Sequence, residues 1–304
     1  MNQTLDNLKE VSRMIVAIIG GAGRMGAWFA KYFLEHGHEV VISDIRVDKA
    51  KEIVKQMGVK LSESNAWAAR GADLVLVSTP IDVTPKVLTE ILPEVDEHAI
   101  IAEITSLKSK VLPVLRGAAI RGKRVLSLHP LFGSGARKLS GEKIALVPVV
   151  DPAGERELAN KIFPEATIVP VDCNLHDRAM ALTLALTHFI NIIFASIIGE
   201  EDINMLKRIG GTTFTLQYVL SEAIISEDPA LYVSIQMGNE NTIIYLNKLI
   251  EKAISLKNII EDKNYDAFIK IYTETRDLLL KDTDFMKAYE KMYSALEAIR
   301  RGDD

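Results

Sequence analysis

A glycine-rich loop near the start of the chain constrains the fold more than any other segment does. Gly21, Gly23 and Gly26 form the pattern G-x-G-x-x-G, directly after the apolar run 14–19 and before a helical stretch at 27–35. In that context one glycine makes a tight turn, the next lets backbone N–H groups approach a pyrophosphate, and the third lets helix and strand pack closely. The loop predicts a dinucleotide site whose contacts in this segment are Gly21, Gly23, Arg24, Met25 and Gly26.

Asp44, at the end of the next apolar run, supports the same ligand. It lies roughly 20 residues beyond the loop, where a carboxylate would accept hydrogen bonds from the ribose hydroxyls of the adenosine. Its negative charge would repel a 2′-phosphate, which favours NAD as the cofactor. Arg46 could accept that phosphate, so NADP stays an alternative. A tight turn beside a solvated aspartate is the other interpretation of these residues.

Short apolar runs alternate with helical stretches from residue 14 to about residue 170. Near-continuous apolar runs of this kind are typical of strands buried on both faces, as in a parallel sheet between two layers of helices. After that point the apolar residues recur at helical spacing. We therefore predict a Rossmann-type doubly wound α/β domain at 14–170 and an all-helical substrate and dimerisation domain at 171–304. The polar segment 1–13 is expected to have no part in the fold.

The segment 179–199 is nearly long and apolar enough to cross a membrane, for which about 20 apolar residues are needed. His188 and Asn191 lie near its middle, where polar groups are costly in hydrocarbon. We expect protein to cover this helix instead, and both polar side chains to have partners. His176 and Asp177, which open the helix, are interpreted as its N-terminal cap. The apolar surface of the helical half predicts a homodimer and no association with membranes.

Charge and cysteine content exclude several classes of protein. The net charge is −5, with 36 Lys and Arg against 41 Asp and Glu, and no basic block is present that would bind nucleic acid. A single cysteine, Cys173, and an opening without the pattern of a secretory signal lead us to expect a cytoplasmic protein. No Cys/His cluster has the spacing of a metal site, so we expect no metal.

Polar residues stand at the ends of three later apolar runs. These residues are Thr79, Ser106 and His129, and ligands of open α/β sheets bind beyond the carboxyl ends of the strands. His129 precedes Pro130, which favours an extended backbone. A neutral histidine there could accept a hydrogen bond or a proton from the hydroxyl of a small-molecule substrate. A histidine that only caps the strand end is the alternative.

Six segments, in order along the chain, resemble the prephenate dehydrogenase family of tyrosine biosynthesis. The resemblance covers nearly the whole chain from Met14, and the block LHPLFG is more specific than the glycine loop. The segments are GGAGRMG (20–26), STPIDVT (78–84), EITSLK (103–108), LHPLFG (128–133), HDRAMALTLALTHF (176–189) and DPALYVSIQMGNE (228–240).

The resemblance implies an oxidative decarboxylation of prephenate to 4-hydroxyphenylpyruvate, in which hydride leaves the ring carbon that bears the hydroxyl. His129 falls on the family's catalytic histidine, which hydrogen-bonds that hydroxyl. Ser106 falls on a serine that orients this histidine or the substrate, and His188 falls on a histidine that lines the substrate cleft. Neither a chorismate mutase domain nor a regulatory domain is expected in addition.

One position departs from the family in a way that concerns the substrate. Ala223 stands where the family has an arginine that holds a substrate carboxylate, and Ser134 replaces a proline. Another cation would have to bind that carboxylate, and the candidates are Arg137, Arg208 and Arg178. The alternatives are a dehydrogenase of arogenate or another small hydroxy acid, and a non-catalytic dinucleotide-binding homologue.

Overall fold

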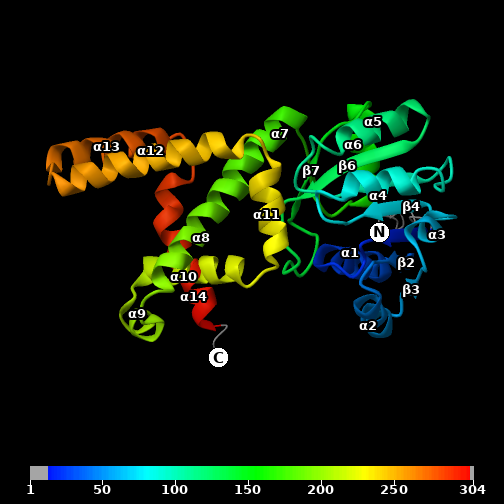
Figure 1. The fold of residues 1–304 in the computed structure, drawn as a ribbon, viewed down its shortest axis with the longest axis horizontal. Coiled ribbons are helices and arrows are strands. Elements are labelled where there is room, and N and C mark those ends of the chain that lie inside the picture. The colour runs from blue at the N-terminus through cyan, green and yellow to red at the C-terminus, as the bar shows by residue number, and fades with distance from the viewer. Residues whose placement is uncertain (1–12, 302–304) are drawn as a thin grey trace, which may run out of the picture. The chain divides into compact units, whose positions relative to one another are not determined.

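The computed structural model describes residues 13–301, so the predicted N-terminal extension lies, up to residue 12, outside the described residues. The chain divides into two compact units between Met180 and Ala181 (Figure 1). The sequence placed this boundary at 170/171, ahead of helix α7 (Cys173–Met180). In the structure α7 belongs to the same unit as the glycine loop.

A mostly parallel sheet forms the centre of the first unit. Over the described residues up to 180 it has eight strands in the order β3-β2-β1-β4-β5-β6-β7-β8, and only β6 and β7 pair antiparallel. The strands are β1 (Ile15–Ile19), β2 (Glu39–Ser43), β3 (Lys60–Leu61), β4 (Leu74–Val77), β5 (Ile100–Glu103), β6 (Arg124–Pro130), β7 (Lys143–Leu146) and β8 (Thr167–Pro170). The order of the first six strands is that of doubly wound dinucleotide-binding folds, so the predicted fold class is confirmed.

Helices cover both faces of this sheet. Alternate residues of β1 belong to opposite apolar cores: Val16 and Ile18 pack with Phe29 of α1, whereas Ala17 and Ile19 pack with the helices of the other face. Burial on both faces is what the near-continuous apolar runs predicted. The helices are α1 (Arg24–Glu35), α2 (Val47–Met57) and α6 (Pro152–Ile162) on the first face, and α3 (Asn65–Ala69), α4 (Thr84–Ile91) and α5 (Leu112–Ile120) on the second.

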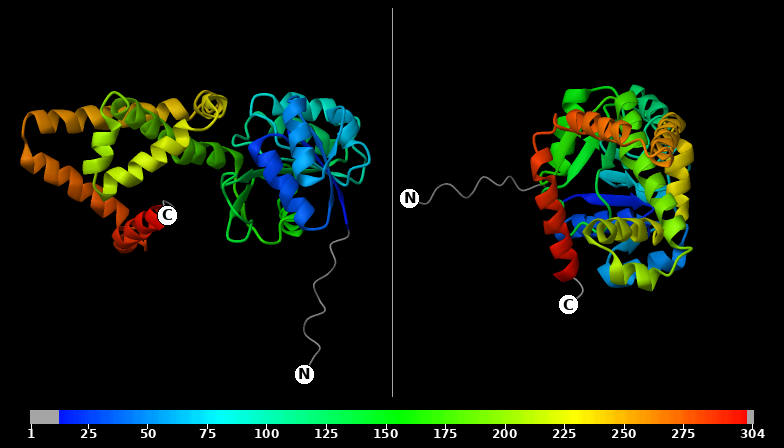
Figure 2. Two further views of the ribbon diagram at one scale, coloured as in Figure 1. Left: turned by 90° about the horizontal axis from the view of Figure 1, so that it is seen from below. Right: turned by 90° about the vertical axis from the view of Figure 1, so that its left-hand side faces the viewer.

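The second unit is built of helices alone over the described residues 181–301 (Figure 2). A π-helical stretch, Ala181–Leu186, leads into α8, which packs along α10. The all-helical prediction for this half is therefore confirmed. The remaining α-helices are α8 (Thr187–Ile198), α9 (Ile203–Ile209), α10 (Thr212–Ile225), α11 (Pro229–Gly238), α12 (Thr242–Glu261), α13 (Tyr265–Leu279) and α14 (Ala288–Arg301), and a short 3-10 helix, Phe285–Lys287, directly precedes α14.

The apolar segment singled out from the sequence lies in a continuous helical run, 173–198. By length and composition this run could cross a membrane, and 17% of its most apolar window is buried within the chain. Asn191 has the expected partners, because it accepts hydrogen bonds from Gln217 at 2.8 Å and Ser221 at 2.9 Å. The ring of His188 packs edge-on against Tyr232, but its buried Nδ1 atom has no hydrogen-bond partner among the described residues. The expectation of a polar partner is wrong for that atom.

Candidate active site

The glycine loop adopts its turn because side chains would not fit. Gly20 has φ +84°, a left-handed conformation that favours glycine, so the tight turn is made by the residue that directly precedes the G-x-G-x-x-G pattern. A Cβ on Gly21 would lie 2.5 Å from Cβ of Ile42, and one on Gly26 would lie 2.2 Å from the carbonyl oxygen of Gly20. Gly21 and Gly26 therefore permit close packing of the loop on β2 and of α1 on the loop.

The start of α1 has the features of a pyrophosphate site. Gly23 is the N-cap residue and has no side chain to bond the first amides, and the first turn carries no acidic residue. A Cβ on Gly23 would lie 3.1 Å from the carbonyl oxygen of Gly20, so it would fill part of the space in which we predict the pyrophosphate to bind. Arg24 is exposed and Met25 packs against the core. Uncapped amides and the helix dipole suit the phosphates of a dinucleotide.

Asp44 contacts the glycine loop and Arg46 together. Its side chain is 3% exposed and accepts hydrogen bonds from the amide of Ala22 at 3.0 Å and from the amide and guanidinium of Arg46 at 2.9–3.1 Å. Burial raises the pKa of this carboxyl, but the hydrogen bonds from Arg46 and Ala22 outweigh it and the pKa is lowered. The carboxylate is ionised and its four acceptor positions are used, so Arg46 must release part of it before a ribose can bind there.

Thr79 lies beside the same loop. Its hydroxyl is 2.8 Å from that of Thr84, the first residue of α4. A Cβ on Gly20 would lie 3.2 Å from Cγ2 of Thr79. The structure thus brings Thr79 to the loop as predicted from its place after β4, and its contact with the cofactor stays a prediction.

His129 is part of a buried chain of hydrogen bonds that the sequence did not predict. The residue lies near the end of β6 and is 5% exposed. Its Nδ1 atom is 3.0 Å from Nε2 of His176, and Nδ1 of His176 is 2.8 Å from Oδ1 of Asp177. We name these three residues the histidine relay. The Nε2 atom of His129 makes no hydrogen bond with the described residues.

The charges around the relay affect the pKa values of Asp177 and His129. Burial raises the pKa of the Asp177 carboxyl, yet hydrogen bonds from His176 and from the amides of Lys108 and Ser109 outweigh it and the pKa is lowered. Burial lowers the pKa of His129 well below its usual value, and the positive charge of Lys108 acts in the same direction. If His176 is neutral, its Nδ1–H donates to the ionised Asp177 and its Nε2 accepts from Nδ1–H of His129. Nε2 of His129 is left with a lone pair, as a base needs.

The expectation that Asp177 caps the apolar helix needs correction. Asp177 does not cap the helix: α7 begins at Cys173, and Asp172 caps it by accepting from the amides of Asn174 and Leu175. Asp177 lies within the helix and points back to the loop after β5.

Ser106 does not orient His129 in the structure. This serine is half-buried in the loop after β5 and makes no hydrogen bond with the described residues. His176 provides the contact that was predicted from Ser106. A contact between Ser106 and the substrate stays a prediction.

The candidate substrate cations are divided between the two units. Arg137 is exposed and lines a cavity of about 530 Å³ along α1, and Arg178 is exposed on α7 in the same unit. Arg208 is exposed on α9 of the second unit, where Ala223 lies exposed on α10. His188 belongs to the second unit as well. Carboxylate binding by Arg137 or Arg208 and cleft lining by His188 stay predictions.

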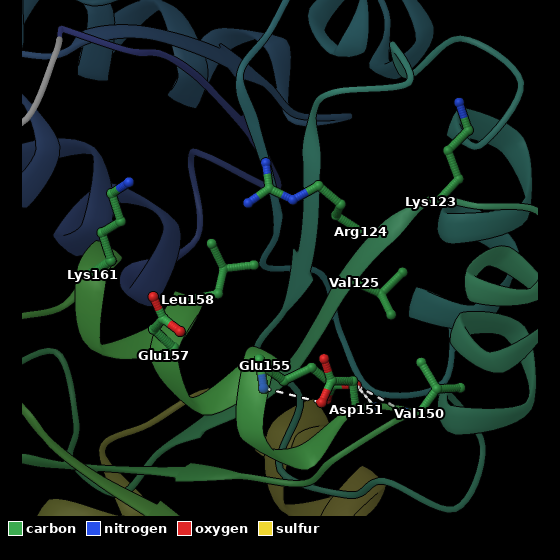
Figure 3. Close-up of a pocket in the computed structure, with 10 residues that line it drawn as sticks. Lys123, Arg124, Val125, Val150, Asp151, Glu155, Glu157, Leu158 and Lys161 are labelled. Atoms are coloured by element: carbon green, nitrogen blue, oxygen red, sulfur yellow. Dashed lines mark hydrogen bonds between the residues drawn. The ribbon is translucent and has the colours of Figure 1, made fainter.

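A cavity of about 430 Å³ at the other end of β6 does not belong to the relay (Figure 3). It is lined by Arg124 and Val125, which begin β6, and by the start of α6. The buried carboxylate of Glu155 accepts hydrogen bonds from the amides of Val149, Val150 and Asp151 at 2.8–2.9 Å. Glu155 therefore has a structural role in shaping the turn before α6.

Two family models match separate parts of the chain. Residues 15–106 match NADP oxidoreductase, coenzyme F420-dependent, and residues 172–274 match the dimerization domain of prephenate dehydrogenase. The chain is 28% identical over 270 residues to a probable arogenate/prephenate dehydrogenase of Methanocaldococcus jannaschii, and this match covers 86% of the chain. The chain spans 60% of the length of that relative.

A further relative and a solved structure extend over most of both chains. A 4-amino-4-deoxyprephenate dehydrogenase of Streptomyces pristinaespiralis is 25% identical, with 92% of this chain and 96% of that protein covered. The fold is similar to prephenate dehydrogenase from A. aeolicus in complex with hydroxyphenyl propionate and NAD+, with a TM-score of 0.73, 20% identity, and coverage of 90% and 99%. Residues 172–274 thus match the dimerization domain of prephenate dehydrogenase and follow a Rossmann-type domain, and most of the chain is similar to prephenate and arogenate dehydrogenases.

Proposed function

We propose that the chain catalyses the oxidative decarboxylation of prephenate to 4-hydroxyphenylpyruvate with NAD(P)+. The histidine relay carries this proposal, because it presents the lone pair of a neutral, buried Nε2 atom near the carboxyl end of β6. That edge of a doubly wound sheet is where the ligands of such folds bind. A dinucleotide-binding protein without catalytic activity would have no use for a neutral base held in one tautomer.

The chain's own residues would bind the ring hydroxyl and take its proton. Nε2 of His129 accepts the hydrogen bond from the hydroxyl, whose acidity rises as its carbon becomes a carbonyl carbon. Asp177, through His176, stabilises the positive charge that His129 gains when it takes the proton. NAD(P)+, when bound at the glycine loop, supplies the acceptor for the hydride from that carbon. Loss of CO2 then makes the ring aromatic, and the phenol oxygen recovers the proton.

A direct assay tests the proposal. Purified protein is incubated with NAD+ or NADP+ and with prephenate, arogenate, 4-amino-4-deoxyprephenate or no substrate, and reduced cofactor is followed by absorbance. We expect turnover with prephenate and a loss of about 10²–10⁴-fold in kcat for His129→Asn, with cofactor binding unchanged. Reduced cofactor forming from none of these substrates would contradict the proposal, and near-normal turnover of His129→Asn would remove His129 from the mechanism.

Arogenate is the second candidate substrate, and Ala223 is the observation that favours it. A guanidinium at this position would bind a carboxylate through two hydrogen bonds, and alanine binds none. A side chain that carries an amine as well as a carboxylate could be held by acceptor groups of the protein. The archaeal relative bears both substrate names. The ratio of kcat/KM for the two compounds decides between them.

We further propose that the chain acts as a homodimer. The matched dimerization domain includes α8, on which Ile190, Ile193 and Ile197 are exposed in the single chain. Exposed apolar surface of this extent requires cover from another molecule. Sedimentation in dilute buffer without detergent should give a dimer, and a stable monomer or a requirement for detergent would contradict this proposal.

A further inference from the structure

Lys108 is a buried lysine whose side chain contacts the residue before His129 and whose backbone contacts Asp177. Its side chain is 0% exposed, and Nζ donates to Glu103 at 2.7 Å and to the carbonyl oxygen of Leu128. Leu128 directly precedes His129 in β6. The backbone N–H of the same lysine donates to the carboxylate of Asp177 at 3.0 Å. One residue therefore holds both the strand that carries His129 and the carboxylate that ends the relay.

The carboxylate that pairs with Lys108 is itself fully used. Glu103, the last residue of β5, accepts from the hydroxyl of Ser127 at 2.5 Å and from the hydroxyl and amide of Thr105 at 2.6 and 2.8 Å. With Lys108 these donors occupy its four acceptor positions. Glu103 and Ser127 also face each other in the register of β5 and β6. The ion pair thus fixes the end of β5 against the end of β6.

Stability alone is a weak reason for this ion pair. The cost of burying two charges offsets most of their attraction, and an apolar pair of similar volume often stabilises a fold as well or better. An apolar pair could not hold the carbonyl of Leu128, nor could it place a positive charge beside His129. The position of the pair therefore points to the relay.

We propose that Lys108, held in place by Glu103, is the positioning residue of the histidine relay: its ammonium group holds the strand that carries His129, and its backbone amide holds the carboxylate of Asp177. This inference rests on the proposed role of His129 as a hydrogen-bond acceptor. Lys108 itself touches neither substrate nor cofactor in this proposal.

The charges and the burial around His129 lower its pKa, as this role requires. Lys108 faces it from the loop after β5 and His176 faces it from α7, and the positive charge of Lys108 lowers the pKa of His129 in addition to burial. Burial lowers the pKa of Lys108 too, and the neighbouring negative charges oppose that change. The groups that face Lys108 and His176 in turn are Glu103, Cys173 and Asp177.

The test replaces the ion pair by a neutral pair of similar size. Lys108→Met alone would leave Glu103 buried and unpaired, so the main variant is Glu103→Gln with Lys108→Met. The matched control is Glu155→Gln, which also removes a buried carboxylate that holds backbone amides, but at the opposite end of β6. Melting temperature and NAD+ affinity establish that each variant is folded.

Two readouts separate positioning from general stability. Nitrogen NMR of histidine-labelled protein, assigned with His129→Asn, reports the tautomer and titration of His129, and steady-state assays report kcat on prephenate. In the wild type we expect the Nδ1–H tautomer and titration well below the usual range. In the double variant we expect the pKa of His129 to rise. We also expect kcat to fall roughly ten- to hundredfold, with the KM for NAD+ unchanged. Glu155→Gln should leave both readouts at wild-type values.

Several results would overturn the inference. The inference would be wrong if His129 of the wild type carried its proton on Nε2 or had the ordinary pKa of a histidine. A folded double variant with wild-type kcat and titration would overturn it as well. A double variant that fails to fold would assign the ion pair a structural role instead. The NMR measurements need no substrate, so inactivity on prephenate together with the expected NMR shifts would contradict the proposed function and leave the role of Lys108 intact.

Discussion

Asp177→Asn is the perturbation that tests the histidine relay most directly. The ionised carboxylate accepts from Nδ1–H of His176, which makes Nε2 of His176 an acceptor for His129. An asparagine can instead turn its NH2 group towards Nδ1 of His176. Both imidazoles would then reverse their tautomers, and Nε2 of His129 would carry the proton. A protonated Nε2 cannot accept the hydrogen bond of the substrate hydroxyl. The variant should therefore stay folded but have no proton acceptor at His129.

The expected magnitude follows from the hydrogen bonds that Asp177 accepts. A misplaced acid–base group costs about 10²–10⁴-fold in kcat, which is roughly 2.7–5.4 kcal/mol of the barrier. The variant also loses at least one charge-assisted bond to His176, Lys108 or Ser109. The free energy of unfolding should fall by about 1.5–3 kcal/mol. Because the pKa of Asp177 is lowered in the folded protein, that stability is present above the ordinary pKa and is lost as the pH falls through the folded pKa.

The assay compares kcat, cofactor affinity and thermal unfolding for the wild type, Asp177→Asn and Glu155→Gln. We expect kcat to fall only in Asp177→Asn, with NAD+ affinity unchanged, and the melting temperature to fall in both variants. Equal kcat in all three proteins would show that the orientation of His129 does not depend on Asp177. A loss of NAD+ binding in Asp177→Asn would show that the change disturbs the whole domain.

The other predictions concern cofactor and substrate charge. Asp44→Ser should raise affinity for NADP+ relative to NAD+, because it removes a negative charge beside the ribose; unchanged affinity ratios would contradict the assignment. Arg46→Ala should tighten NAD+ binding, because it frees the carboxylate of Asp44; weaker binding in a titration would assign Arg46 a direct contact with NAD+. Arg137→Ala or Arg208→Ala should raise the KM for prephenate roughly ten- to hundredfold, since a charge-assisted bond contributes about 1.5–3 kcal/mol. Ala223→Arg should lower that KM, and the opposite result in steady-state assays would favour a substrate with one carboxylate.

The parts of the fold that the sequence predicted are those that local patterns determine. Near-continuous apolar runs require burial on both faces, and β1 accordingly sends alternate residues into two cores. The glycine loop was predictable because Gly21 and Gly26 have no room for a Cβ. The residue that makes the turn was not predictable, because two adjacent glycines, Gly20 and Gly21, could each have taken the positive φ.

The parts of the site that the sequence missed depend on contacts between distant residues. Asp177 binds the amide of Lys108, 69 positions earlier, and no periodicity or spacing connects the two. A His-Asp pair at the start of a helix has an adequate local explanation as a cap. The signal that could have indicated the relay was the presence of four polar side chains, Lys108, His129, His176 and Asp177, near predicted buried elements, because each needs a partner.

The charges of the relay also affect how the carboxylates of the substrate can be bound. The buried carboxylates of Glu103 and Asp177 are each satisfied by donors from their own unit, so neither projects an uncompensated charge towards the substrate. Prephenate carries two carboxylates, and a neutral His129 can approach such a substrate without either attracting or repelling it strongly. Lys108, a buried lysine of the first unit, pairs with Glu103 at 2.7 Å, so its ammonium group is not free to bind a substrate carboxylate. We therefore expect an exposed residue, Arg137 or Arg208, to bind the substrate carboxylate and the relay to supply only the base.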